Sequence, residues 1–158
     1  MRKYGTQRGF TIVEVMGVVA IMGVLAVLVI PAVKINTIRA KMAEVIYAFG
    51  PCKAMITEVY LSGGDPPASD NSWGCEVGGG ASTYVDAIKT TSEGKITVVL
   101  HGFNGDGRFD THQVTLTPLD NTGNVMSGGG IVARWRCGLP ADDTDVAAQY
   151  LPSSCRGG

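Results

Sequence analysis

An unbroken apolar block near the N-terminus constrains this chain more than any other feature of its sequence. Between Phe10 and Val33 the only ionisable side chain is Glu14. A helix rises about 1.5 Å per residue, so the part from Val15 to Val33 nearly matches the roughly 30 Å thickness of a bilayer's hydrocarbon core. Including Phe10 to Glu14 makes the block long enough to cross it. We therefore predict a transmembrane helix over residues 10–33.

The segment in front of this block, residues 1–9, is polar and carries Arg2, Lys3 and Arg8. Cations beside a membrane segment stay on the cytoplasmic side, so we expect the N-terminus in the cytoplasm. A secretory signal peptide has a shorter apolar region followed by a cleavage site with small residues. No such site follows Val33. The chain instead continues with helical periodicity. A plain membrane anchor is the other interpretation of this segment.

Glu14 is the feature that a plain anchor does not explain. A carboxylate inside a membrane segment costs several kcal/mol, which makes such a residue a functional candidate. The alternative is a carboxylate close enough to the bilayer surface to remain hydrated.

From Lys34 to Leu61 the apolar residues recur every three or four positions, which is the period of an amphipathic helix. They are Ile35, Ile38, Met42, Val45, Phe49, Cys52, Ile56 and Val59. The charged residues lie off this stripe, so we expect the stripe to pack against the rest of the chain. The breakers from Ser62 to Pro67 end the helix.

Gly23, Pro31 and Pro51 interrupt the helical pattern. In a helix interior, glycine costs about 1 kcal/mol and proline about 3 kcal/mol relative to alanine, and proline also removes a backbone hydrogen bond. We expect the helix to kink at these three positions. The alternative is simple tolerance, because both residue types are common in membrane helices.

Residues 62–158 predict a head that follows the helix. The part from 62 to 94 is rich in glycine and serine and is expected to be a loop. Strand patterns follow at residues 95–101, 113–119 and 131–137, with turn residues between them. Successive strands joined by turns imply an antiparallel sheet over residues 95–137. Packed on the helical stripe, this sheet gives an α+β fold.

The chain has four cysteines, an even number in a protein that looks exported, and this favours two disulfides. Four cysteines allow three pairings. The simplest joins sequence neighbours, Cys52 with Cys75 and Cys137 with Cys155. The rival is a zinc site, which we do not expect because no CxxC or HxxxH spacing occurs.

The remaining polar residues predict no metal site, cofactor or enzyme. His101 and His112 flank a turn, and the run from Asn104 to Asp110 offers oxygen ligands at alternate positions, as calcium prefers. However, Gly102 stands where an EF-hand loop has its first aspartate, and no glutamate follows at the right spacing. No nucleophile, base and orienting group are visible together. The net charge of −1 gives no attraction to nucleic acid or anionic membranes.

The start of the apolar block resembles a known signal. The sequence GFTIVEV, residues 9–15, behind a short basic leader, is similar to the class III signal of type IV pilins and pseudopilins. In that family the leader ends in glycine, phenylalanine usually follows, and a glutamate stands five residues past the cut. Gly23, Pro31 and Pro51 also match positions where type IVa pilins commonly carry a glycine and two prolines. The match is close over residues 1–61 and looser beyond.

This resemblance implies how the chain is processed and assembled. A prepilin peptidase of the inner membrane would cut between Gly9 and Phe10, remove residues 1–9 and methylate the new Phe10 amine. Glu14 would then pair with the Phe10 amine of a neighbouring subunit and set its axial register, because either charge alone is costly in an apolar filament core.

The implied partners are other copies in a helical filament, the inner-membrane pilus assembly machinery and minor pilins. The precursor is expected in the bacterial inner membrane, with its N-terminus in the cytoplasm and its head in the periplasm. The assembled subunit is expected in an extracellular pilus.

The resemblance also assigns parts of the head. Residues 62–94 correspond to the αβ-loop of pilins, and residues 137–155 resemble the D-region, a variable loop bounded by a disulfide. Closing a loop of this size is worth roughly 3 kcal/mol, so we expect the Cys137–Cys155 disulfide to supply the loop's order. Many pilins have only this bridge, so Cys52–Cys75 departs from the pattern.

Three functions remain open. The favoured one is a major type IVa pilin, a structural subunit that serves adhesion, twitching motility or DNA uptake. A pseudopilin of a type II secretion system is the second, although major pseudopilins usually lack the C-terminal disulfide loop. A minor pilin with a DNA-binding or adhesive role would be supported by a basic stripe on the head. The cations available for it are Lys89, Lys95, Arg108, Arg134, Arg136 and Arg156.

Overall fold

The computed structural model describes residues 9–103 and 109–157, with the backbone alone for residues 28–32. Most of the predicted leader and the turn at residues 104–108 therefore lie outside the described residues. The chain divides into two units, Met1–Asn36 and Thr37–Gly158. We call them the stem unit and the head unit and describe each by itself.

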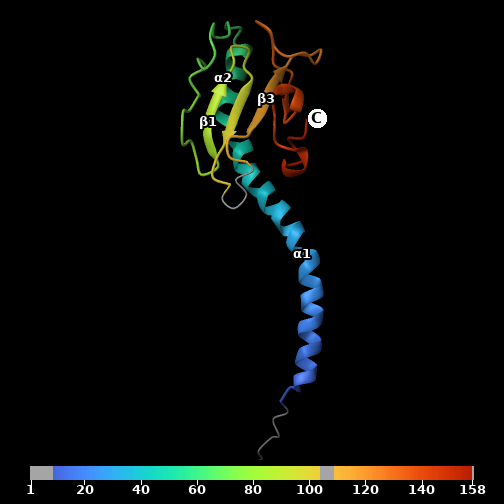
Figure 1. Cartoon of the computed structure of the whole chain (residues 1–158). Coiled ribbons are helices and arrows are strands. Elements are labelled where there is room, and N and C mark those ends of the chain that lie inside the picture. Colours follow the sequence, from blue (N-terminus) through green and yellow to red (C-terminus); the bar gives the residue numbers. More distant parts are fainter. Residues whose placement is uncertain (1–8, 104–108, 158) are drawn as a thin grey trace, which may run out of the picture. The chain divides into compact units, whose positions relative to one another are not determined.

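Two helices form the first part of the chain, α1 over Ile12–Tyr47 and α2 over Gly50–Leu61 (Figure 1). Helix α1 continues through Gly23 and Pro31. Pro51 stands in the first turn of α2, where its missing N–H costs no helical hydrogen bond. Kinks at these three residues stay a prediction.

The stem unit has exposed apolar side chains along the part of α1 whose side chains the structure describes up to Val27. From Phe10 to Val27 the large apolar side chains are between 50% and 83% exposed. In the part of the chain that the structure describes, no helix is both long enough and apolar enough to cross a membrane.

The head unit contains one sheet of four antiparallel strands in the order β1-β2-β3-β4. The strands are β1 (Val85–Thr90), β2 (Ile96–Leu100), β3 (Gln113–Leu119) and β4 (Arg134–Cys137). The antiparallel sheet and the α+β class predicted from the sequence are thus confirmed. Strand β1 lies in the stretch that we expected to be loop, and β4 begins three residues later than the pattern at 131–137 indicated.

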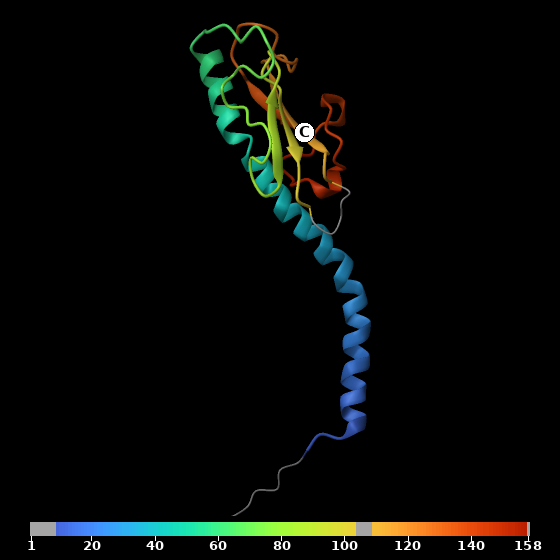
Figure 2. The same ribbon diagram turned by 60° about the vertical axis from the view of Figure 1, so that its left-hand side comes forward.

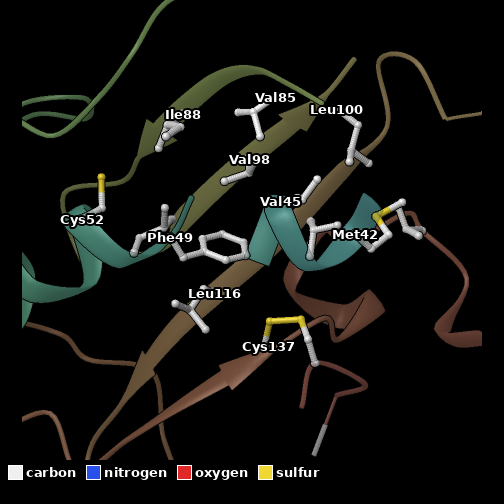
Figure 3. Packing of buried hydrophobic residues seen from close by; sticks show 14 of the residues in the cluster. Met42, Val45, Phe49, Cys52, Val85, Ile88, Val98, Leu100, Leu116 and Cys137 are labelled. Atoms are coloured by element: carbon white, nitrogen blue, oxygen red, sulfur yellow. A yellow bond between two sulfur atoms is a disulfide. The ribbon is translucent and has the colours of Figure 1, made fainter. Parts of the chain in front are cut away.

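The last turns of α1 and the whole of α2 cover one face of this sheet (Figure 2). Met42, Val45 and Phe49 face the sheet residues Val98 and Leu100 (Figure 3), and all five are almost fully buried. Fully burying a side chain of this kind is worth about 1.5–3 kcal/mol. Of the predicted helical stripe, Met42, Val45, Phe49, Cys52 and Ile56 are buried in this core, and Ile38 and Val59 are partly buried against it, whereas Ile35 is not part of it.

Candidate functional site

The predicted cleavage site lies directly before α1. Gly9 and Phe10 are exposed, Phe10 to 83%. A Cβ placed on Gly9 would meet no atom within 4 Å. Thr11 then opens the helix, since its hydroxyl and carbonyl oxygens accept hydrogen bonds from the amide of Glu14 at 3.3 and 3.1 Å. The Gly9–Phe10 bond is thus an accessible peptide bond beside a capped helix start.

Glu14 stands in the first turn of α1, where a negative charge interacts favourably with the helix dipole. Its side chain is exposed, and no cation of the described residues lies within ion-pair distance. Apolar side chains surround it along the stem. The carboxylate is therefore available to a positive group of another molecule.

Both predicted disulfides are present in the head unit. Cys52 on α2 bonds to Cys75, with their Cα atoms 5.1 Å apart, and so fastens the loop after α2 to the helix. Cys137 at the end of β4 bonds to Cys155, with a Cα separation of 4.6 Å. The second bond closes the loop 137–155, which we call the C-terminal loop.

The C-terminal loop is also held by charge. Arg136 on β4 donates hydrogen bonds from Nε and from one terminal guanidinium nitrogen to the carboxylate of Asp142, at 2.8 and 2.7 Å. Asp142 is buried at the end of a short 3₁₀ helix, η1 (Pro140–Asp142). The hydrogen bonds from Arg136 lower the pKa of Asp142, and Thr117 and Lys95 contribute in the same direction.

Two further aspartates of this loop contact side chains that directly precede strands of the sheet. Lys95, just before β2, lies 2.6 Å from Asp143. His112, just before β3, places Nδ1 3.0 Å from Asp145. We expected the disulfide to supply the loop's order, but three carboxylates reach three different parts of the sheet and share that role.

The loop between α2 and β1 has its own anchors. The indole N–H of Trp73 donates to the carbonyl oxygen of Thr91 at 2.8 Å. The Glu76 carboxylate accepts hydrogen bonds from the amides of Trp73 and Gly74 at 2.9 and 2.8 Å, and from the Thr90 hydroxyl. Burial alone would raise the pKa of Glu76, but these hydrogen bonds outweigh it and lower the pKa. The Glu76 carboxylate thus connects the loop residues Trp73 and Gly74 to Thr90 at the end of β1.

Metal binding finds no support in the described ranges, where no group of three or more histidine, cysteine or acidic side chains is placed to hold an ion. The calcium alternative concerned Asn104 to Asp110, and residues 104–108 lie outside the described ranges. His112 is engaged with Asp145, and His101 is exposed.

The candidate cations for a basic stripe are dispersed. Lys89 is on β1 and Arg134 on β4, which are the two opposite edges of the sheet. Lys95 and Arg136 are engaged with aspartates of the C-terminal loop. Arg108 lies outside the described residues. Arg156 donates a hydrogen bond from Nε to the carbonyl oxygen of Leu151. Of the described candidates, only Arg134 and Arg136 share a strand.

Two family models match this chain, one at its N-terminus and one over the rest. The family model for pilins, described as a bacterial filament, matches residues 38–156, and the prokaryotic N-terminal methylation motif matches residues 5–30. The type IV major pilin PilE of Neisseria gonorrhoeae is 30% identical, with 95% of this chain and 94% of the relative covered. A fimbrial protein of Neisseria meningitidis serogroup B is 29% identical, again with 95% of this chain and 94% of the relative covered.

The fimbrial protein EcpC of Eikenella corrodens is 31% identical, with 95% of this chain and 91% of the relative covered. These matches extend through the N-terminal signal, the helices and the head. The chain therefore belongs to the type IV pilin family, whose members are structural subunits of bacterial filaments and not enzymes.

Proposed function

We propose that this chain is the precursor of a major type IV pilin, which is cut between Gly9 and Phe10, methylated on the Phe10 amine and assembled into a pilus. One observation carries the proposal. An exposed glycine–phenylalanine bond precedes a helix that has a single carboxylate, Glu14, among exposed apolar side chains as far as Val27. The names of the relatives from Neisseria gonorrhoeae, which are called major pilins, support the same role.

Type IV pilins are extracellular pilus subunits made as membrane-anchored precursors. For this chain we assign the anchoring role to residues 10–33 and the cytoplasmic side to the leader. The cations Arg2, Lys3 and Arg8 support that orientation. The head would then fold in the periplasm, an oxidising compartment that suits its two disulfides.

Assembly places the exposed apolar stems of many copies together and removes them from water. Removal of the leader gives each copy a cationic Phe10 amine, and each stem brings one carboxylate, Glu14. A buried charge that loses its partner costs about 3–5 kcal/mol. Pairing Glu14 with the Phe10 amine of a neighbour therefore favours one axial register of the incoming subunit over all others.

The main alternative is a pseudopilin of a secretion system, which would share the stem. The C-terminal loop closed by Cys137–Cys155 favours the pilus subunit. In a minor pilin the stem and its chemistry would be the same, but the protein would be scarce in the filament.

The test is to shear surface filaments from the producing bacterium and to identify their subunits by mass spectrometry. We expect this chain to be the most abundant protein of the filament fraction, and we expect deletion of its gene to abolish the filaments. Filaments that persist after the deletion, or that contain this chain only in traces, would contradict a major pilin.

A further inference from the structure

The edge strand β4 carries two arginines on one face of the sheet. Arg134 and Arg136 stand two positions apart, and side chains at that spacing project from the same side of a strand. Leu119 on β3 is the partner of Arg134 across the ladder, so its side chain lies on that side as well. One pocket of about 220 Å³ is lined by Leu119, Gly123, Arg134, Trp135 and Arg136. We call it the arginine pocket.

One of the two guanidinium groups is held in place. The Arg136 side chain is 23% exposed and donates two hydrogen bonds to the carboxylate of Asp142, which is buried. These bonds use two of the N–H donors of the group, and its other donors remain. The charges of Arg136 and Asp142 compensate each other. Arg136 therefore provides the pocket with a fixed donor group but with no excess charge.

The other guanidinium group has no acidic partner. Arg134 is exposed, and within the described ranges no carboxylate lies at ion-pair distance from it. The group lies against the turn after β3, because a Cβ added to Gly123 would be 2.9 Å from its Nη2 atom. Asp120, the acidic residue of that turn, accepts hydrogen bonds at Oδ1 from the amides of Thr122 and Asn124. Arg134 therefore brings an uncompensated positive charge to the pocket.

Two guanidinium groups with one excess positive charge match the chemistry of a phosphate or sulfate group. The planar N–H fork of arginine binds such oxyanions with strong, charge-assisted hydrogen bonds. The oxygens of a phosphate or sulfate point in tetrahedral directions, so one group can accept hydrogen bonds from both arginines at once. Pockets for drug-sized ligands measure about 300–1,000 Å³. The arginine pocket is smaller and therefore fits one compact group.

We propose that the arginine pocket binds one phosphate or sulfate group, either as the free ion or as the ester group of a small molecule. Arg136, held by Asp142, orients the group, and Arg134 supplies the net charge that attracts it. The site belongs to the head unit alone. It depends neither on cleavage after Gly9 nor on assembly, and so it goes beyond the proposed function.

Calorimetric titration of the full-length protein, in detergent and in a chloride buffer, tests the pocket. The probes are sodium sulfate, sodium phosphate, glucose 6-phosphate and galactose 6-sulfate. We expect saturable binding of one group per chain. Arg134→Gln should weaken that binding by about tenfold or more, because a charge-assisted hydrogen bond and the excess charge are both lost. Lys89→Gln removes an exposed cation on the opposite edge strand and is the matched control, which should bind like the wild type.

The ions and the esters separate the two sources of the group. Tighter binding of an ester than of its ion supports the pocket with an ester as ligand, and equal binding supports it with the free ion. Titrations that show no saturation in the wild type would overturn the site, as would equal dissociation constants for the wild type and Arg134→Gln. Binding of heparin or duplex DNA without binding of any single group would also overturn it, because such a surface needs repeated charges.

Discussion

The guanidinium group of Arg136 donates two hydrogen bonds to the carboxylate of Asp142, at 2.8 and 2.7 Å. The pair connects β4 to η1 within the C-terminal loop, and Asp142 is only 9% exposed. Because such a pair is largely removed from water, loss of one partner leaves the other group without compensation. The pair therefore stabilises the loop in addition to the Cys137–Cys155 disulfide.

Asp142→Ala should lower the free energy of unfolding by about 1–3 kcal/mol, because the half-buried Arg136 loses its acceptor. Asp143→Ala is the matched control. It removes the neighbouring ion pair with Lys95, but the Asp143 side chain is 65% exposed, so the loss should be at most about 1 kcal/mol. Chemical denaturation of the full-length protein in detergent measures both values. Equal losses in the two variants would contradict the role given to Asp142.

The same pair makes stability depend on pH. The pKa of Asp142 is lower in the folded protein than its ordinary value, chiefly because of Arg136. Its stabilising contribution is therefore fully present above the ordinary pKa, about 4, and is lost as the pH falls through the lower folded value. Denaturation between pH 7 and strongly acidic pH should show a larger loss for the wild type than for Asp142→Asn. Parallel pH dependences would be inconsistent with this account.

Sequence patterns that lie within one short segment of the chain were enough to predict the cleavage motif and the helical stripe. The cleavage motif occupies consecutive residues, and the helical stripe repeats at a fixed period, so both could be recognised without a structure. Strand β1 escaped prediction because a bulge between Val85 and Ala87 breaks its alternation, and because it follows a long glycine- and serine-rich loop. The period of two on which strand prediction depends is lost at that bulge.

The contacts of the C-terminal loop could not be predicted, for a different reason. The loop contains Asp142, Asp143 and Asp145, but their partners Lys95 and His112 come from distant parts of the sequence. Only the folded sheet brings these two side chains close to the loop. The aspartates were visible as residues, whereas their role depends on the fold.

Gly138 should tolerate substitution poorly. It has a φ of +74°, and an added Cβ would lie 2.5 Å from the carbonyl oxygen of Cys155 and 2.9 Å from a methyl carbon of Leu151. Gly128 has a similar φ of +88° but open space around it. Both alanine variants incur the left-handed strain of about 1–2 kcal/mol. Gly138→Ala should lose clearly more stability in thermal denaturation, and equal losses would show that the contact with Cys155 is unimportant.

Glu14→Gln tests the register mechanism, because it keeps the side-chain shape and removes the charge. The variant should be cleaved normally, yet its filament yield should fall by about tenfold or more, since the Phe10 amine of a neighbour remains unpaired in the filament core. Glu58→Gln removes an exposed carboxylate of α2 and is the control, which should assemble like the wild type. Normal filaments of the Glu14 variant would refute the register role.

The intact mass and N-terminal sequence of the subunit taken from sheared filaments test the central claim most directly. The account predicts a chain that begins at Phe10, carries one N-terminal methyl group and retains both disulfides. A filament subunit that still contains residues 1–9, or that begins at any other residue, would contradict it.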